Sequence, residues 1–253
     1  MRYLIISDLH SNLEALQAVL AASDGAYEKV ICCGDLVGYG ADPNAVVEWC
    51  RGHITLAVRG NHDKVCCGIA DTSDFSELAR LSAYWTRNQL TPENRQYLED
   101  LPQGPHAVGS QFAILHGSPR DEDEYLPTVW AAARAFDFLK HRLSFFGHTH
   151  LQGGFTKSRA RVQQIELNQI TKSASSKRKS SAMLEIQAGE TYLLNPGAVG
   201  QPRDRDNRAA FAIYDTDGLV EYGRVHYDID AAMQKILQAG LPDFLAYRLV
   251  VGR

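Results

Sequence analysis

Short apolar runs separated by amphipathic segments dominate the first sixty residues. The runs are short and apolar, which is typical of buried strands. They occupy residues 3–7, 29–33 and 54–58. Ser11 and Glu14 have the spacing of a capping box and predict that a helix begins there. Pro43 predicts the first position of another helix and Gly52 the end of it. Strands that alternate with helices predict an α/β fold built in layers.

The spacing of apolar residues becomes helical after residue 70. Leu78, Leu81, Tyr84 and Trp85 recur at helical intervals, so we expect them on the buried face of a helix. A further helix begins near Thr91, and together these helices predict a helical insertion over about residues 70–105. Later strands are expected over residues 112–115, 143–146 and 191–194, with a hairpin over 209–227 and a helix over 230–237.

The whole chain, residues 1–253, is predicted to form one domain, because no internal repeat and no linker-like stretch divides it. One segment departs from the pattern of strands and helices. Residues 171–181 are lysine, arginine and serine with almost no apolar side chain, so we expect an exposed, mobile loop. A solvated hairpin tip accounts for this composition better than a nucleic-acid-binding arm.

Composition excludes several classes of protein. Hydrophobic residues make up 45% of the 253, which supports a full core and excludes a disordered or fibrous chain. The net charge of −4 gives no general attraction to nucleic acid or to an anionic membrane. No apolar run approaches the ~20 residues of a membrane span, and the first residues lack the features of a signal peptide. We therefore expect a cytoplasmic protein, and the odd count of five cysteines favours reduced thiols over disulfides.

Five of the predicted strands end in residues of the types that bind metal ions. Loops at the carboxyl ends of strands converge in open α/β sheets, so residues far apart in the chain can gather in one cleft. The residues that we expect to gather are Asp8, His10, Asp35, Asn61, His116, His148 and His150.

This set combines carboxylate, amide and imidazole donors and contains no thiolate. Such a mixture suits manganese, iron, zinc, nickel or cobalt, and manganese is the ion that we favour. Seven ligands exceed what one tetrahedral zinc ion needs, but they suit two divalent ions that share a bridging carboxylate. Pairs of metal ions about 3.5–4 Å apart serve in-line attack at phosphorus.

The order of these residues resembles that of the calcineurin-like metallophosphoesterases. The matching blocks are Asp8-x-His10, Gly34-Asp35, Gly60-Asn61-His62-Asp63, His116 and Gly147-His148-x-His150. The likeness is greatest to the small prokaryotic, phosphodiesterase-type branch, and residues 195–203 extend it, although that branch usually has serine in place of Ala198. The resemblance implies a sandwich of two mixed β-sheets flanked by helices, with which the predicted elements are compatible.

The resemblance also implies a role for each residue of the blocks. One metal ion would be held by Asp8, His10 and His150, and the other by Asn61, His116 and His148, with Asp35 bridging them. His62 would face the leaving-group oxygen as a general acid or as a stabiliser of the transition state. Asp63, its neighbour, would orient the His62 ring.

A metal-dependent phosphoric ester hydrolase is the function that the resemblance implies, with a metal-bridging hydroxide attacking phosphorus in line. We expect a phosphodiesterase or phosphatase with a small or nucleotide-like phosphoester substrate. Arg203 and Arg120 are candidates for substrate binding because arginine suits phosphate, and Tyr39 because it closely follows Asp35. Two alternatives stay open: a non-catalytic metal-binding scaffold of the same fold, and a nuclease. The nuclease would need a basic track, and only residues 171–181 supply a basic cluster.

Overall fold

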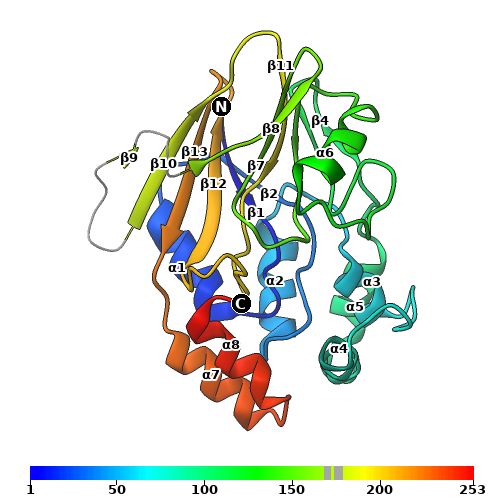
Figure 1. Cartoon of the computed structure of the whole chain (residues 1–253). Coiled ribbons are helices and arrows are strands. Elements are labelled where there is room, and N and C mark those ends of the chain that lie inside the picture. Colours follow the sequence, from blue (N-terminus) through cyan, green and yellow to red (C-terminus); the bar gives the residue numbers. More distant parts are fainter. Residues whose placement is uncertain (168–171, 174–178) are drawn as a thin grey trace.

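Two mixed β-sheets face each other at the centre of the molecule (Figure 1). The computed structural model describes residues 1–167, 172–173 and 179–253. The described strands of the first sheet follow the order β3 (Leu56–Ala57), β2 (Lys29–Cys32), β1 (Arg2–Ile6), β12 (Ala209–Asp215), β13 (Leu219–Val225), β10 (Lys179–Glu185) and β9 (Lys172–Ser173). Those of the second sheet follow the order β4 (His106–Val108), β5 (Phe112–Ile114), β6 (Leu143–Phe145), β11 (Glu190–Asn195), β7 (Gly153–Ser158) and β8 (Arg161–Gln164). The predicted sandwich of two mixed sheets is confirmed.

Strand direction brings the ends of several strands to one edge. In the first sheet β1 runs parallel to β2, with Leu4 opposite Val30, and antiparallel to β12, with Leu4 opposite Ile213. In the second sheet β6 runs parallel to both β5 and β11. Parallel neighbours deliver the loops that follow them to the same edge of the sheet.

Side chains of β1 alternate between two cores, as the period of two in a strand requires. Tyr3 and Ile5 pack between the sheets, against residues of the second sheet that include Phe112. Leu4 and Ile6 point the other way, into a core shared with the helices. Because both faces of this strand are covered, its residues form the continuous apolar run seen in the sequence.

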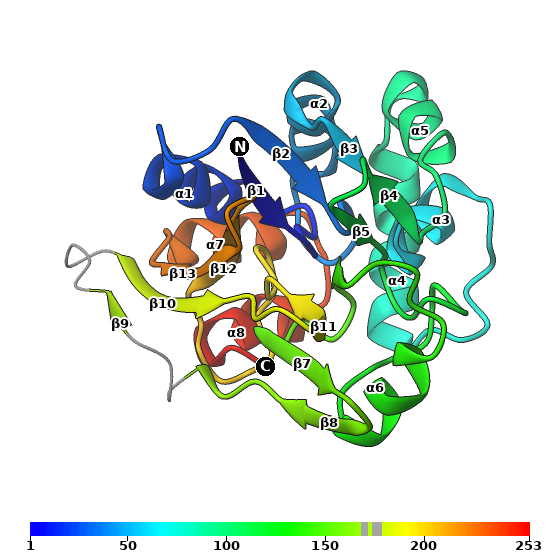
Figure 2. The ribbon, with the colours of Figure 1, turned by 90° about the horizontal axis from the view of Figure 1, so that it is seen from above.

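Helices cover the outer faces of both sheets and close one end of the sandwich (Figure 2). Their bounds are α1 (Leu13–Ser23), α2 (Pro43–His53), α3 (Asn61–Cys67), α4 (Glu77–Gln89), α5 (Pro92–Glu99), α6 (Val129–Phe136), α7 (Ile229–Gln238) and α8 (Asp243–Val251). α1 packs on β12 and β13, and α6 packs on β7, β8 and β11. α7 and α8 pack against each other at the end where β1 finishes (Figure 1).

Two helix boundaries differ from the prediction. The side chain that caps α1 is Asn12, which accepts a hydrogen bond from the backbone N–H of Ala15, and not Ser11. Ser11 has φ of 53° and belongs to the loop that follows β1. Gly52 lies inside α2 rather than beyond it, because the helix continues to His53.

The buried face of α4 also differs from the prediction. The helices expected over residues 70–105 are present as α4 and α5. Leu81 and Tyr84 are nevertheless exposed, and α4 turns smaller residues inward: Ala79, Ser82, Ala83 and Thr86. Leu78 and Trp85 are partly buried against the cluster formed by α7 and α8. The apolar spacing therefore predicted the helix correctly but placed its buried side about one residue away.

The segment predicted as a mobile loop, residues 171–181, is only partly described. Its described parts are strands, because residues 172–173 form β9 and residues 179–181 begin β10. The prediction of a loop is therefore wrong for these residues. The remainder lies outside the described residues. All five cysteines are free and buried, as reduced thiols would be. No helix within the described ranges is long and apolar enough to cross a membrane. A single domain and a cytoplasmic location stay predictions.

Candidate metal centre

The predicted ligands meet where the two sheets bring their loops together. Each follows a strand: Asp8 and His10 follow β1, Asp35 follows β2, Asn61 begins α3 after β3, His116 follows β5, and His148 and His150 follow β6. Loops from both sheets thus contribute to one buried group. The convergence that was predicted from strand order is present in the structure.

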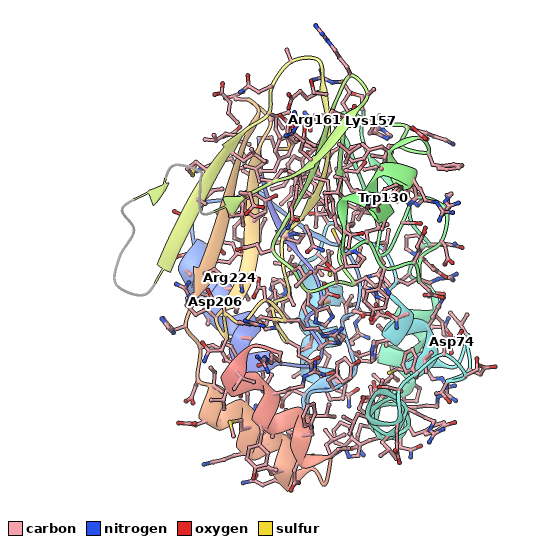
Figure 3. The ribbon with its side chains drawn as sticks, in the orientation of Figure 1. Asp74, Trp130, Lys157, Arg161, Asp206 and Arg224 are labelled. Atoms are coloured by element: carbon pink, nitrogen blue, oxygen red, sulfur yellow. The ribbon has the colours of Figure 1, made fainter. Side chains whose placement is uncertain are left out.

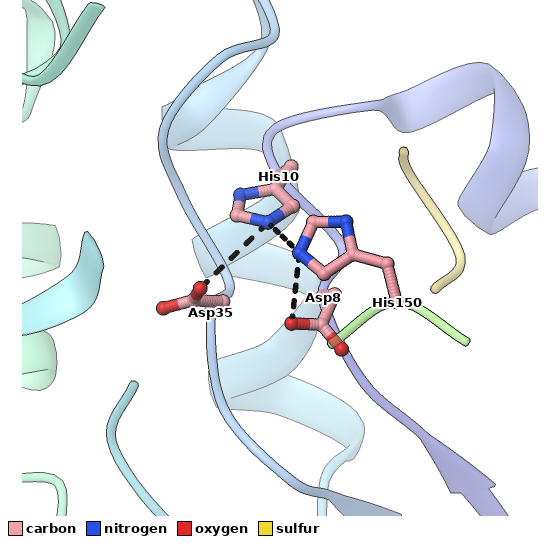
Figure 4. Close-up of side chains that lie close together, drawn as sticks. All are labelled: Asp8, His10, Asp35 and His150. Carbon is pink, nitrogen blue, oxygen red and sulfur yellow. Dashed lines mark hydrogen bonds and ion pairs between the residues drawn. The ribbon is translucent and has the colours of Figure 1, made fainter. Parts of the chain in front are cut away.

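Four of these residues form the first cluster: Asp8, His10, Asp35 and His150. One ligand atom from each lies within 4.8 Å of the others, and all four side chains are buried. His150 Nε2 lies 3.3 Å from Asp8 Oδ1, and His10 Nε2 lies 3.7 Å from Asp35 Oδ2 (Figure 4). The two ring nitrogens are themselves 3.1 Å apart. The four side chains therefore surround a common point, which is what a bound cation requires.

A second cluster contains Asp35, His116 and His148, again with ligand atoms within 4.8 Å of one another. His116 Nε2 lies 3.3 Å from Asp35 Oδ2 and 3.2 Å from Asn61 Oδ1. Asn61 therefore lies beside this group, and its role as a ligand stays a prediction. Asp35 is shared by the two clusters, so its carboxylate lies between the two potential ion sites.

Hydrogen bonds on the outer side of each ring aim its other nitrogen inward. His10 Nδ1 donates to Val37 O at 3.0 Å, His116 Nδ1 to Cys33 O at 2.8 Å and His150 Nδ1 to Gln201 O at 2.6 Å. A carbonyl oxygen can only accept, so these bonds place a proton on Nδ1 and direct Nε2 toward the cluster as the potential ligand atom.

His148 has the opposite arrangement, because its Nε2 lies 3.0 Å from the backbone oxygen of Asp123. The loop that carries Asp123 is fixed by a network of charges: Lys64 Nζ lies 3.0 Å from Glu122 Oε1 and 2.6 Å from Asp123 Oδ2. Arg59 completes the network at 3.0 Å from Glu122. This bonding leaves Nδ1 of His148 as its ligand atom.

Strained backbone coincides with the predicted ligands. Five of them have positive φ, a region that non-glycine residues rarely occupy: Asp8, His10, Asp35, His148 and His150, with φ between 47° and 65°. Such conformations cost about 1–3 kcal/mol each and gather at functional sites, where the surrounding fold enforces them. Close packing contributes here, because a Cβ on Gly60 would overlap Asp35 Oδ1.

Burial and neighbouring charges set the protonation of the clusters. Burial acts to raise the pKa of Asp35, but the His116 and His62 rings outweigh it and hold that pKa well below its usual range. Burial acts to lower the pKa of His116, but the Asp35 carboxylate outweighs it and raises that pKa to about 10. Burial lowers the pKa of His148 to about 3. Ionised carboxylates thus lie beside one imidazole that they keep protonated, His116, and others that burial keeps neutral, such as His148.

This donor set fits divalent cations. Asp8 Oδ2 is buried and has no hydrogen-bond partner in the described part of the chain, so a charged oxygen is left unsatisfied. A buried, unpartnered carboxylate oxygen is costly unless a cation compensates it. Oxygen and nitrogen donors without thiolate agree with the ions predicted from the sequence. The two clusters are consistent with a dinuclear site, and the residues leave the identity of the metal open.

His62 lies beside the clusters, and its backbone N–H donates to Asp35 Oδ1 at 2.9 Å. Its ring packs 5.0 Å from that of His10 and 4.4 Å from that of Tyr39. Burial lowers the pKa of His62 to about 4, so the ring is neutral at physiological pH. Its Nδ1 is buried without a hydrogen-bond partner in the described residues.

Asp63 does not orient the His62 ring, contrary to the prediction. Its Oδ1 accepts from the backbone N–H groups of Leu36 and Val37 at 2.8 and 3.2 Å. Its Oδ2 accepts from the N–H of Gly60 at 2.9 Å. Asp63 therefore ties the loop that carries Asp35 to the start of α3, because three backbone donors would otherwise be buried without partners.

A cavity of about 550 Å³ opens next to His62 and His148. Tyr39 and Arg203 line it, as expected of substrate-binding residues, whereas Arg120 does not. Arg120 instead forms an ion pair with Glu124 at 3.1 Å and lies over the ring of Phe138. The side chain of Arg120 is thus engaged away from the cavity.

Several lining residues had no signal in the sequence analysis. They are Lys64, Phe75, Asp123, Tyr125 and Arg248. Tyr125 stacks on His148 with ring centroids 3.7 Å apart. The acidic run at residues 121–124, so close after His116, was the one available hint of a loop at the site. Nothing in the sequence pattern linked Arg248, in the last helix, to residues before position 150.

Known proteins are similar to this chain in sequence and in fold. Residues 1–219 match the model of the calcineurin-like phosphoesterase superfamily domain. The uncharacterized protein MJ0912 of Methanocaldococcus jannaschii is 35% identical over 255 residues, which cover 98% of this chain and 97% of that protein. A crystal structure of a metallophosphoesterase from Sphaerobacter thermophilus is 37% identical with a TM-score of 0.82, covering 100% of this chain and 99% of that one.

A more distant protein has the same fold. The crystal structure of hypothetical protein PH1004 from Pyrococcus horikoshii OT3 is 18% identical, with a TM-score of 0.76. The match covers 100% of this chain and 98% of the PH1004 chain. The architecture described above therefore persists where most side chains differ.

Proposed function

Because the chain belongs to the calcineurin-like phosphoesterase superfamily, we propose that it is a phosphoric ester hydrolase with a dinuclear metal site. The observation that carries this proposal is Asp35, whose carboxylate belongs to both clusters of potential ligands. In the proposal one ion is held by Asp8, His10, Asp35 and His150, and the other by Asp35, Asn61, His116 and His148. Manganese is the ion that we favour.

Two bound divalent cations would supply charge that polarises phosphoryl oxygens and lowers the pKa of a water molecule. The protein's own groups do the rest. His62 is a neutral ring at the wall of the cavity, so it donates a hydrogen bond through N–H to a phosphoryl or leaving-group oxygen. Of the two roles expected for His62, stabilisation of the transition state suits this neutral ring better than transfer of a proton.

The cavity supports a small substrate. Its volume of about 550 Å³ lies within the range of ~300–1,000 Å³ that is usual for small-molecule sites. Aromatic side chains on its wall, Tyr39, Phe75 and Tyr125, can pack against an organic group esterified to phosphate. A phosphodiesterase or phosphatase acting on a small or nucleotide-like ester is the activity that agrees with these dimensions.

Hydrolysis of nitrophenyl phosphoesters tests the proposal. Purified protein with Mn²⁺ is assayed on nitrophenyl phosphate and bis-nitrophenyl phosphate, before and after treatment with a chelator. We expect metal-dependent turnover that Asp35→Asn and His148→Ala abolish, because each variant removes a ligand. His226→Ala, which removes an exposed imidazole, is the matched control and retains activity. Full activity in either ligand variant would refute the assignment, and metal binding without turnover would favour the scaffold.

A further inference from the structure

Two arginines flank one aromatic ring on the cavity wall. The guanidinium carbons of Arg203 and Arg248 each lie 5.8 Å from the centroid of the Tyr39 ring. Both arginines and Tyr39 line the cavity of about 550 Å³. Two positive groups thus approach the same small part of the cavity, from the loop that follows β11 and from the last turn of α8.

Neither guanidinium forms an ion pair with an aspartate or glutamate side chain in residues 1–167 or 179–253. Arg203 Nη2 lies 3.2 Å from Gln201 Oε1 and 3.5 Å from Tyr39 Oη, which are neutral oxygens. Arg203 Nε is buried without a partner. Arg248 Nε donates to the backbone oxygen of Arg253. The largely buried Arg203 cation has an unpartnered donor and no side-chain carboxylate beside it, so an anion at this place would relieve it.

The other charges on the cavity wall are compensated or lie elsewhere. Lys64, the third cation, is neutralised by Glu122 and Asp123 at 3.0 and 2.6 Å. Asp71 and Asp74 come from the segment between α3 and α4, and neither forms an ion pair with Arg203 or Arg248 in the described part of the chain. The side of the cavity formed by Tyr39 and α8 is therefore positively charged.

Arg203 is held firmly against the metal centre. Its backbone N–H donates to His150 O at 3.3 Å. The segment that follows it is braced by Arg224, which donates to Gln152 Oε1 at 2.9 Å and pairs with Asp204. Arg224 and Asp206 lie side by side at this end of the first sheet (Figure 3). The position of Arg203 is therefore set by the fold and needs no ligand to define it.

Arg248 lies outside the part of the chain that the family model matches, which ends at residue 219. α8 packs on α7 and contributes to a core with Tyr39. Burial and the charge of Arg203 lower the pKa of Arg248 to about 10, which still leaves it charged at neutral pH. One of the two positive charges on this side of the cavity thus comes from a helix beyond the matched region.

We propose that Arg203 and Arg248 form an anion subsite that binds a second phosphoryl group of the substrate. The inference rests on the proposed function, because it assumes that another phosphoryl group occupies the metal centre. Two guanidinium groups match the double negative charge of a phosphoryl group better than the single charge of a carboxylate, and each can donate two parallel hydrogen bonds. The substrate class is a bisphosphorylated small molecule, either a sugar or a nucleoside.

Binding measurements test the subsite without relying on turnover. Calorimetry on the Mn²⁺-loaded protein with His62→Ala, which slows turnover, compares fructose 1,6-bisphosphate with fructose 6-phosphate, and adenosine 3′,5′-bisphosphate with adenosine 5′-phosphate. We expect at least one bisphosphate to bind about tenfold or more tightly than its monophosphate, and Arg248→Gln to remove that advantage. Arg51→Gln, which neutralises an exposed arginine on α2, is the matched control and keeps the advantage. The sugar and nucleoside pairs distinguish the two sources of the second phosphoryl group.

Hydrolysis of the same pairs with Mn²⁺ separates the two proposals. We expect Arg248→Gln to lower the ratio of kcat/KM for the bisphosphate over the monophosphate by about tenfold or more. A wild-type protein that hydrolyses esters but shows no preference for either bisphosphate, in binding or in turnover, would overturn the subsite and leave the proposed function intact. Absence of all hydrolysis would refute the proposed function, while the binding measurements would still decide the subsite.

Discussion

Asn195 holds together the loop that carries His148 and His150, and its replacement tests whether the fold enforces the geometry of the site. The buried side chain donates through Nδ2 to Gly147 O at 2.8 Å and to Thr149 Oγ1 at 3.0 Å. Its Oδ1 accepts from the N–H of Gly197 at 2.8 Å. One side chain at the end of β11 therefore bonds to the loop after β6 and to its own turn.

The magnitude follows from these three bonds. Each buried hydrogen bond contributes about 1 kcal/mol net, so Asn195→Ala should lower the free energy of unfolding by about 3 kcal/mol. Asn195→Asp keeps an acceptor for Gly197 but places a carboxylate oxygen against the carbonyl of Gly147, so we expect a loss at least as large. Without this brace, His148 and His150 can relax from φ of 65° and 59°, and we expect affinity for Mn²⁺ to fall about tenfold or more.

Urea unfolding of the metal-free protein measures the first effect, and competition with a chelator measures the second. The matched control is Asn207→Ala, because Asn207 makes a single exposed hydrogen bond, to Val250 O at 2.9 Å. We expect that control to cost about 1 kcal/mol or less and to leave metal affinity unchanged. If Asn195→Ala changed stability by less than about 0.5 kcal/mol and left Mn²⁺ affinity unaltered, the idea that this side chain enforces the ligand geometry would be refuted.

Three further predictions concern the metal centre and the charges around it. Mn²⁺ at a thousandfold excess over its dissociation constant should add about 4 kcal/mol to the free energy of unfolding, and a chelator should remove that gain. Gly60→Ala should weaken Mn²⁺ binding more than about tenfold, because its Cβ would overlap Asp35 Oδ1, whereas Gly52→Ala, which meets nothing within 4 Å, should not. Glu122→Gln should destabilise by about 1–3 kcal/mol at pH 7. Burial acts to raise the pKa of Glu122, but Arg59 and Lys64 outweigh it and hold that pKa below its usual value. The ionised carboxylate therefore stabilises the fold above pH ~4, and this stabilisation is lost as the pH falls and Glu122 becomes protonated. Urea unfolding of wild type and variant should then give converging free energies in acid.

The strands that frame the site were predictable because their physics is local. β1 and β2 are covered on both faces, so each appears in the sequence as an unbroken apolar run. The ends of β1 and β2 were marked by Ser7-Asp8, directly after Ile6, and by Gly34-Asp35, shortly after Cys32. The convergence of Asp8 and Asp35 then followed from the rule that loops after parallel strands share an edge.

Short edge strands and single contacts could not be predicted in the same way. β8 is an edge strand and β7 is its neighbour, and each has a single apolar residue, Phe155 or Val162, among glycine, threonine and polar residues. Their pairing is decided by the sheet rather than by their own pattern. Ser11 and Asn12 are both good caps, and only the left-handed turn after β1 decides that Asn12 is the cap. For Asp63, sequence adjacency suggested a partner in His62, although neighbours along a helix point in different directions.

The geometry of the metal centre also explains why its residues tolerate an unfavourable environment. Asp8 and Asp35 are fully buried carboxylates, and the pKa values of the His10 and His148 rings are lowered by burial, so those rings compensate little of the negative charge. Backbone strain at the same positions adds to the cost. A bound divalent cation would offset both costs in the folded state alone, because the unfolded chain does not bring these loops together. The strain and the buried charge are thus the physical reasons for which we expect metal binding to stabilise this fold.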